Sequence, residues 1–189
     1  MSFLDNSKNV GTAFWVVGII EIVLGLLMIV MGVVDDGTDL VYGAINGVGS
    51  ILVGLLYLGF GKDIRNGVIS SKWDIVCRFV MVTAIATALN GIFGYNSDIG
   101  TWAVNIIVGI ILALIIMWIH KKMTDGQATT LDKIIWILLL LIMIISFICD
   151  IISLIAFPIG TIMGICGIII DGFMIIALLD NEVKSKMGM

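Results

Sequence analysis

The sequence predicts an all-α membrane protein with six transmembrane helices, arranged as three pseudo-repeated hairpins. The chain has 189 residues, of which 60% are hydrophobic and only 13% are charged. Its apolar residues gather in six runs, each close to the roughly 20 residues that a helix needs to cross a bilayer core. All ten Lys and Arg residues fall on the same side of this six-span plan. By the positive-inside rule that side, with both termini, is cytoplasmic, which predicts an integral protein of the cell or inner membrane.

The six predicted spans follow one another with short connections, as a single polytopic domain over residues 1–189. They cover residues 12–33, 40–60, 75–94, 100–119, 134–157 and 159–179. The first run is longer than the apolar core of a signal peptide, and no small-residue cleavage site follows it, so we expect a retained helix. Residues 35–39 and 95–98 have the Asp, Asn, Ser and Gly composition of tight turns, and Pro158, the only proline, ends the fifth span.

The charges indicate which side of the membrane each connection faces. The predicted cytoplasmic side holds Lys8, Lys62, Arg65, Lys72, Lys121, Lys122, Lys133, Lys184 and Lys186, with Arg78 just inside the third span. The outer turns hold the acids Asp35, Asp36, Asp39 and Asp98. The formal net charge of −4 therefore reflects sidedness, and we expect no nucleic-acid partner. The expected partners are the lipid bilayer, anionic headgroups at the basic loops, and a second copy or another membrane subunit.

The sequence contains three repeats of a helical hairpin. A shift of 59 positions superimposes the glycines and polar residues of the first hairpin on those of the second: Gly32 on Gly91, Asp39 on Asp98, Asn46 on Asn105, Lys62 on Lys121, and Gly67 on Gly126. A further shift of 60 places residues 99–101 over 159–161 and Asn90 over Asp150. We therefore expect repeats of about 12–67, 71–126 and 130–186, all parallel and related by an axis along the membrane normal.

The glycine spacing of these hairpins resembles that of the HdeD-like acid-resistance membrane proteins. Gly18 and Gly25 frame a Gly-Ile-x-x-Ile-x-x-Gly type of first helix, and Gly43, Gly47 and Gly54 give a glycine-rich second helix. The resemblance spans most of the chain. It implies a fold of short two-helix repeats, commonly three of them, and a small non-enzymatic inner-membrane protein with a role in acid or envelope stress.

Stripes of small and polar residues predict which face of each span looks inward. In lipid, helices associate where small residues let backbones approach and where polar residues find partners. Such stripes are Gly18, Glu21, Gly25 and Gly32 in the first span; Gly43, Gly47, Ser50 and Gly54 in the second; Thr83, Thr87, Asn90 and Gly94 in the third; Asn105 and Gly109 in the fourth; Ser146, Asp150 and Ser153 in the fifth; and Gly160, Gly164, Gly167 and Asp171 in the sixth. We interpret the glycines as packing seams.

The intramembrane acids need a separate reason, because a charge near the bilayer centre costs at least about 2.5 kcal/mol on insertion scales. By position in the spans, Glu21 and Arg78 match in depth and are predicted to form a salt bridge. Asp150 and Asp171 have no cation at their depth and are expected to be protonated if they are dry. Asn46, Asn90 and Asn105 complete the polar set in the outer third.

Two functions follow from this set of acids. In the first, the carboxyl groups are hydrogen-bonded connections between helices in a structural or stress-related protein. In the second, Asp150, Asp171 and Glu21 form a stepped pathway for protons or cations, as in a small transporter or channel. A third alternative is a membrane subunit of a larger complex. The first two differ in whether the three acids line one cavity.

The sequence argues against an enzyme and predicts no catalytic residue, metal site or cofactor. It has no Gly-x-Ser-x-Gly elbow, His-Glu-x-x-His motif or phosphate-binding loop. The sole histidine, His120, is expected at the cytoplasmic interface. An intramembrane aspartyl protease needs two facing aspartates, and we expect Asp150 and Asp171 to differ in depth by about one to two turns, a separation read from the helix pitch.

Overall fold

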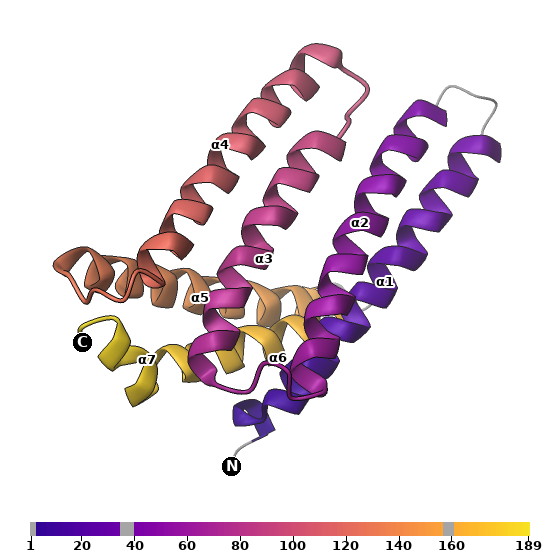
Figure 1. Ribbon diagram of the computed structural model, residues 1–189. Helices are drawn as coiled ribbons and strands as arrows, with labels where there is room; N and C mark the ends of the chain where they lie inside the picture. Colours follow the sequence, from indigo (N-terminus) through magenta and orange to yellow (C-terminus); the bar gives the residue numbers. More distant parts are fainter. Residues whose placement is uncertain (1–2, 35–39, 157–160) are drawn as a thin grey trace.

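The computed structural model describes residues 3–34, 40–156 and 161–189, and over these ranges the chain is helical without any strand. The described residues form a short 3-10 turn at Phe3–Asp5 and seven α-helices. Figure 1 labels the helices α1 to α7. The helices are α1 (Ser7–Val34), α2 (Leu40–Arg65), α3 (Lys72–Phe93), α4 (Ile99–Met123), α5 (Thr130–Ala156), α6 (Thr161–Leu178) and α7 (Asn181–Lys186). The predicted all-α class is confirmed.

Five of the helices are long and apolar enough to cross a membrane: α1 to α4, and α5 over Thr130–Ile152. The sixth, α6, is an apolar helix of 18 residues as described, and its apolar part is shorter than the other five. Its expected first residue, Ile159, lies outside the described residues, as do the turns at 35–39 and 157–158. The six-residue helix α7 was not predicted.

Neighbouring helices pair in the order in which they follow in the chain. α1 packs chiefly on α2, α3 on α4, and α5 on α6. In Figure 1 the first two pairs run alongside each other, with α2 next to α3. The described part of the chain therefore contains three antiparallel helix pairs at the places where the sequence predicts hairpins.

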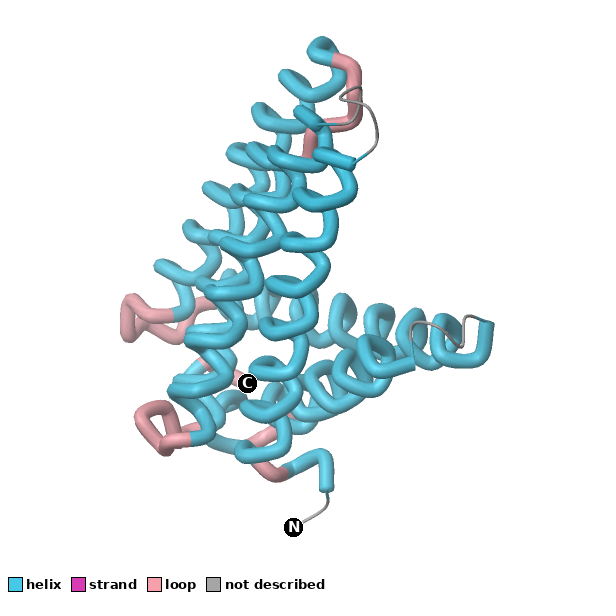
Figure 2. The backbone as a smooth tube through the Cα atoms, turned by 90° about the vertical axis from the view of Figure 1, so that its right-hand side faces the viewer, coloured by secondary structure: helices cyan, strands magenta, loops and turns pink. Residues whose placement is uncertain are grey.

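The third pair does not stand beside the other two. In both Figure 1 and Figure 2, α5 and α6 run across the lower ends of α1 to α4, near the termini. A single axis along the membrane normal therefore does not relate all three pairs, and that expectation is wrong for α5 and α6. The physical reason is packing: Phe173, Met174 and Leu178 of α6 are at most 2% exposed in the core at this end.

Two tryptophans take part in the same core. Trp73 of α3 and Trp136 of α5 are each 8% exposed. The Trp136 indole donates a buried hydrogen bond of 2.7 Å to the Leu178 carbonyl oxygen. Because a buried indole N–H needs an acceptor, this bond fixes α5 against the end of α6.

The outer faces of α4 and α5 are apolar and exposed. In α4 only Gly109, Ala113 and Met123 are buried. The exposed side chains of α5 include Ile137, Leu138, Leu141, Ile142, Ile145, Ile148 and Ile152. A helix that is hydrophobic all round belongs in an apolar environment, so these faces fit contact with lipid acyl chains rather than water.

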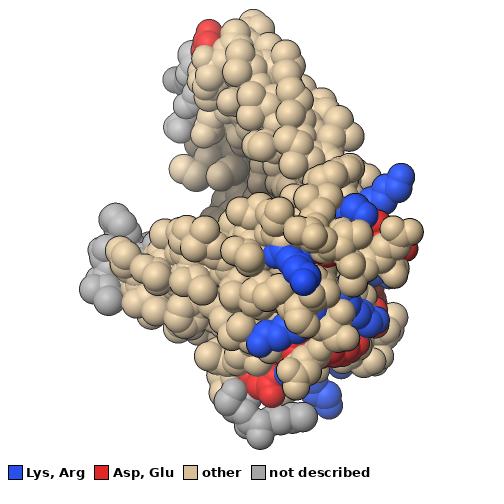
Figure 3. Space-filling model, turned by 90° about the vertical axis from the view of Figure 1, so that its left-hand side faces the viewer, with Lys and Arg blue, Asp and Glu red and all other residues tan. Residues whose placement is uncertain are grey.

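The charged side chains gather at the end where the termini and α7 lie, as the face in Figure 3 shows. Lys62 and Arg65 lie in the last turn of α2, and Lys184 and Lys186 in the last turn of α7. Lys72, the first residue of α3, is 2.7 Å from Asp5 and 3.0 Å from Asp180. This ammonium group thereby joins the segment before α1 to the segment before α7.

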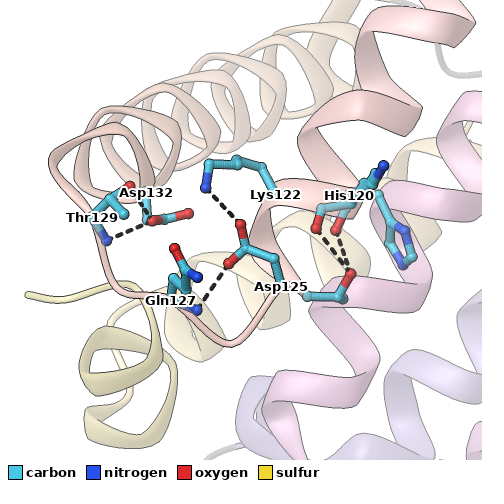
Figure 4. A network of polar contacts seen from close by, with 8 residues as sticks. His120, Lys122, Asp125, Gln127, Thr129 and Asp132 are labelled. Atoms are coloured by element: carbon cyan, nitrogen blue, oxygen red, sulfur yellow. Dashed lines mark hydrogen bonds and ion pairs between the residues drawn. The ribbon is translucent and has the colours of Figure 1, made fainter.

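The connection between α4 and α5 is closed by short-range polar contacts (Figure 4). The Lys122 ammonium lies 2.5 Å from the Asp125 carboxylate, which also accepts the Gln127 N–H. Asp132, 1% exposed, accepts from both the N–H and the hydroxyl of Thr129, in the manner of a capping box. These bonds satisfy donors that the helix itself leaves unpaired.

Two of the superimposed glycines share an uncommon backbone conformation. Gly67, after α2, has φ of +72°, and Gly126, after α4, has φ of +77°. Only glycine adopts this left-handed region readily, and it commonly ends helices there. The two positions that the 59-residue shift aligns thus share a backbone conformation.

Candidate functional site

Glycines on α1 and α2 form a continuous seam in which the two backbones touch. Gly11, Gly18, Gly25 and Gly32 recur at every seventh residue of α1, and Gly47, Gly54 and Gly61 do so in α2. A Cβ added at Gly18 would lie 2.6 Å from the Gly54 carbonyl oxygen, and one at Gly25 would lie 2.5 Å from that of Gly47. Gly43 faces Gly32 in the same way. A side chain larger than hydrogen therefore does not fit at these positions.

Glu21 lies in this seam and is hydrogen-bonded to α2. The Ser50 hydroxyl is 2.5 Å from the Glu21 carboxylate and 3.0 Å from its carbonyl oxygen. Both residues line a small cavity of about 180 Å³ together with Asn46 and Asn90. The carboxyl group thus has a polar partner from the neighbouring helix, in a space that contains two more amide side chains.

The predicted salt bridge between Glu21 and Arg78 is absent from the part of the chain that the structure describes. Glu21 shares its cavity with Asn90 of α3, which lies about 18 Å along the helix from Arg78 at 1.5 Å per residue. The depth matching was wrong because Glu21 lies at the middle of a 28-residue helix, rather than in its inner half. Arg78 lies instead near the beginning of α3.

The three asparagines of the polar set have different surroundings. Asn46 donates to the Tyr42 carbonyl oxygen of its own helix and, at 2.8 Å, to that of Tyr95 after α3. Asn90 lines the cavity of Glu21. Asn105 lies at the close approach of α3 and α4, where its carbonyl oxygen would be 2.9 Å from a Cβ at Gly91. Asn46 and Asn105 therefore do not occupy equivalent environments.

Asp150 and Asp171 lie side by side, which corrects the expected difference in depth. The Asp150 carboxyl group and the Ser146 hydroxyl are within hydrogen-bonding reach of the Asp171 carboxyl. Asp171 is 6% exposed, and its Oδ2 has no hydrogen-bond partner among the described residues. Two carboxylates this close in an apolar setting cannot both be ionised, so the pair is expected to hold a proton.

Asp150 packs against glycine residues of α6. Asp150 packs directly on the backbone at Gly167, so that a Cβ there would collide with the carboxyl group. Gly164 faces Leu154 and the Asp150 carbonyl oxygen at ordinary contact distances. Gly160, the fourth residue of the predicted stripe with these two and Asp171, lies outside the described residues.

The acids thus fall into two separate groups. Glu21 belongs to a cavity between α1, α2 and α3. Asp150 and Asp171 belong to the interface of α5 and α6, and neither lines the cavity that contains Glu21.

A third polar group lies where α3 begins and α4 ends. Arg78, His120 and Asp74 line a cavity of about 440 Å³, the largest of those described. The buried thiol of Cys77 lies on the same wall. His120 had been expected at the membrane interface, which is consistent with its place near the end of α4. Its proximity to Arg78 and Asp74 was not predicted.

The donor atoms of these groups do not form a metal site. No cluster of three or more His, Cys, Asp or Glu side chains that could hold a metal ion occurs within the described ranges.

Comparisons with protein-family models, curated proteins and solved structures give no match.

Two signals in the sequence could have found what the prediction missed. The seven-residue glycine period extends the α1 seam to Gly11 and the α2 seam to Gly61. In an antiparallel hairpin, facing residues are equally far from the turn, which places Asp150 opposite Gly167 and Ser146 opposite Asp171. The predicted difference in depth between Asp150 and Asp171 was counted from the ends of the spans and did not take this antiparallel register into account.

Proposed function

We propose that the protein is a non-enzymatic, multi-pass membrane component with a structural role, in envelope or acid stress, of the HdeD-like type. In this proposal α1 to α4 form two hairpin repeats that span the membrane, the hairpin of α5 and α6 is a third repeat that lies across their end, and both termini are cytoplasmic. The glycine spacing that resembles the HdeD-like proteins supports the family type, and the matching left-handed glycines at Gly67 and Gly126 support the repeats.

The observation that carries the structural role is the position of Glu21. Its carboxylate is bonded to Ser50 inside a seam of glycine contacts, where it connects α1 to α2. The cavity that Glu21 lines includes neither Asp150 nor Asp171, and this separation supports a structural role over a stepped pathway. Carboxyl groups that each serve a local helix interface fit a structural component.

Proton flux into liposomes tests this proposal. We expect wild-type protein to give no pH-driven flux above that of empty liposomes, and Asp171→Asn to keep the fold, since Asn retains the shape and a donor. Cells that lack the protein should lose survival in acid, and Asp171→Asn should restore that survival. Flux well above the empty-liposome level that disappears in Asp171→Asn would contradict the structural role.

A second candidate, a small proton- or cation-conducting protein, is favoured by the paired carboxyls. Asp150, Asp171 and Ser146 form a place where one proton can be held between two acids. Conduction would require Asp150→Asn and Asp171→Asn each to abolish flux while thermal stability is kept. Normal flux in both variants would remove this candidate.

A third candidate, a membrane subunit of a larger complex or of a homo-oligomer, is favoured by the exposed apolar face of α5. Chemical crosslinking in native membranes tests it. Crosslinks from α5 to a second copy or to another protein would support it, whereas crosslinks within a single chain only would leave α5 facing lipid.

A further inference from the structure

We propose that the cavity at Arg78 and the apolar groove beside it form a binding site for a phospholipid with a primary-amine headgroup. Arg78 would hold the phosphate, Asp74 would accept the ammonium group, and an acyl chain would lie between α2 and α3. This goes beyond the proposed structural role.

Arg78 has no ion-pair partner in the described part of the chain. Four other cations at this end are engaged, Lys72 with Asp5 and Asp180, Lys122 with Asp125, Arg65 over the Trp15 ring and Lys186 over the Trp73 ring. Among the cations without such a partner, Arg78 is the one that lines the 440 Å³ cavity. Arg78 has neither a salt bridge nor an aromatic face. A guanidinium at the membrane edge binds phosphate oxygens through two parallel hydrogen bonds.

The depth of Arg78 suits a phosphate. It follows the first residue of α3 by six positions, which is about 9 Å along the helix. With Lys72 placed at the aqueous edge of the headgroup layer, which is about 5 to 8 Å thick, the guanidinium would lie near the inner boundary of that layer. His120, which shares the cavity, can donate a second hydrogen bond to a phosphate.

The charges of the cavity suit a headgroup with both signs. Asp74 lines the same 440 Å³ cavity as Arg78, and Asp63 lines the adjoining groove. Two carboxylates would repel a purely anionic headgroup. A primary ammonium group donates hydrogen bonds to carboxylates, whereas a quaternary ammonium cannot.

The cavity at Arg78 continues into an apolar groove that an acyl chain could occupy. A second cavity of about 260 Å³ shares Ile69, Arg78 and Met81 with the first. It reaches toward the other end of the helices along Leu55, Phe60 and Ile85. Gly59 lies in its wall, and a Cβ there would meet no atom within 4 Å. A polar cavity at headgroup depth is thus joined to an apolar groove between α2 and α3.

Native mass spectrometry of the detergent-solubilised protein, titrated with phospholipids of identical chains, tests the site. We expect phosphatidylethanolamine to bind at least threefold more tightly than phosphatidylcholine or phosphatidylglycerol. Arg78→Gln should weaken binding of all three about tenfold. Asp74→Asn should remove the preference for phosphatidylethanolamine over phosphatidylcholine and leave phosphatidylcholine binding unchanged.

The matched control is Lys121→Gln, which removes one charge at the same end of α4 from an exposed residue that lines neither cavity. It should leave all affinities unchanged. A loss equal to that of Arg78→Gln would mean general surface attraction and would overturn the site. Tighter binding of phosphatidylglycerol than of phosphatidylethanolamine would overturn the assigned headgroup.

The groove is tested with Gly59→Leu, whose side chain should fill the open space. Binding of lipids with long chains should fall at least fivefold, while a dihexanoyl lipid should bind as to the wild type. Gly59→Ala, which leaves most of the space free, controls for folding. Free phosphoethanolamine should bind far more weakly than the whole lipid, and equal affinity would instead indicate a site for a soluble phosphate.

Discussion

Glu21 and Ser50 show how one hydroxyl can keep a carboxylate in an apolar helix pair. The hydroxyl lies 2.5 Å from the carboxylate, and the two residues come from different helices. A buried acceptor that loses its donor keeps the full cost of desolvation, about 1 to 3 kcal/mol. Removing the Ser50 hydroxyl should therefore cost more free energy than the hydrogen bond contributes when it forms.

We accordingly expect Ser50→Ala to lower the free energy of unfolding by about 1 to 3 kcal/mol. The measurement is reversible unfolding in mixed micelles. Thr83→Ala is the control, because the Thr83 hydroxyl donates only to the Phe79 carbonyl oxygen of its own helix. An effect of Ser50→Ala no larger than that of the control would indicate that Glu21 has another partner.

The separation of Glu21 from Arg78 gives a second prediction at this scale. Because the two side chains line different cavities, the destabilisations of Glu21→Gln and Arg78→Gln should add within about 0.5 kcal/mol in the double variant. The same unfolding measurement checks it. A double variant that regains stability relative to the sum would show that the two residues interact.

The carboxyl group of Asp180 gives a pH-dependent prediction. The N–H of Glu182 and then the Lys72 ammonium hold its pKa below the ordinary value of 3.8. Since the pKa is lowered in the folded protein, the stabilisation is complete above pH 3.8 and is lost as the pH falls through the lowered pKa.

Asp180→Asn should therefore lower the melting temperature by a few degrees at pH 6, in keeping with the small value of exposed ion pairs. The difference from the wild type should shrink when both are measured below pH 3. A difference that stays constant over this range would mean that Asp180 acts through its shape and not through its charge.

At the scale of the element, the helix pair α1 and α2 depends on the absence of side chains. The sites at Gly18, Gly25, Gly47 and Gly54 each place a would-be Cβ within 2.7 Å of a backbone oxygen on the facing helix. Backbone cannot move aside as a flexible side chain can. A seven-residue period keeps such a seam facing the partner helix over its whole length.

Gly25→Ala should thus force the helices apart and destabilise the protein by about 1 to 3 kcal/mol, the usual cost of overpacking. Gly59→Ala is the matched control on α2, where no atom lies within 4 Å of the added Cβ. It should be neutral or stabilise by up to about 1 kcal/mol, because alanine favours the helix. Equal effects in the two variants would argue against the seam.

The helices themselves could be predicted, while their partners could not in every case. Apolar runs near 20 residues locate α1 to α5 well, because a bilayer length is a local property of the sequence. The stripes with Gly43, Gly47 and Gly54 identify the face that packs on α1. The prediction of a salt bridge between Glu21 and Arg78 was wrong because it needed the relative alignment of α1 and α3. Counting positions from the ends of the spans does not give that alignment.

At the scale of the whole molecule, the crosswise direction of α5 and α6 relative to α1 to α4 could not be predicted from the sequence. The hydropathy pattern is the same whether α5 and α6 run along the other helices or across them. The arrangement is determined by the core at the end near the termini, where Ile75, Phe173, Met174 and Val183 are almost completely buried. That core needs residues from distant parts of the chain.

A cysteine pair distinguishes the two arrangements. In a six-span parallel plan, Thr12 lies at the cytoplasmic end and Ile165 in the outer half. In the structure both line one cavity of about 320 Å³ between α1 and α6. Thr12→Cys with Ile165→Cys, in a background without Cys77, Cys149 and Cys166, should therefore be joined by a short thiol crosslinker. Failure to crosslink would indicate that the third pair stands upright.

Labelling from the two sides of the membrane tests the sidedness of the whole chain. Cysteine at Ser97, between α3 and α4, should react with an impermeant reagent in intact cells, since the Lys and Arg residues all lie at the opposite end. Cysteine at Ser70 or Thr129 should react only after the membrane is opened. Reaction at Ser70 from outside would refute this orientation.

The crosswise hairpin also makes the molecule unequal in cross-section. Four helices reach the end near Phe93 and Ile99, whereas α5 and α6 widen the opposite end (Figure 2). A body of this shape displaces more area in one leaflet than in the other, so it fits best where the wider leaflet is on the convex side of a bent bilayer. In supported bilayers drawn into narrow tubes, the protein should therefore concentrate in the tubes when its Lys- and Arg-rich end faces outward, and leave them when it faces inward.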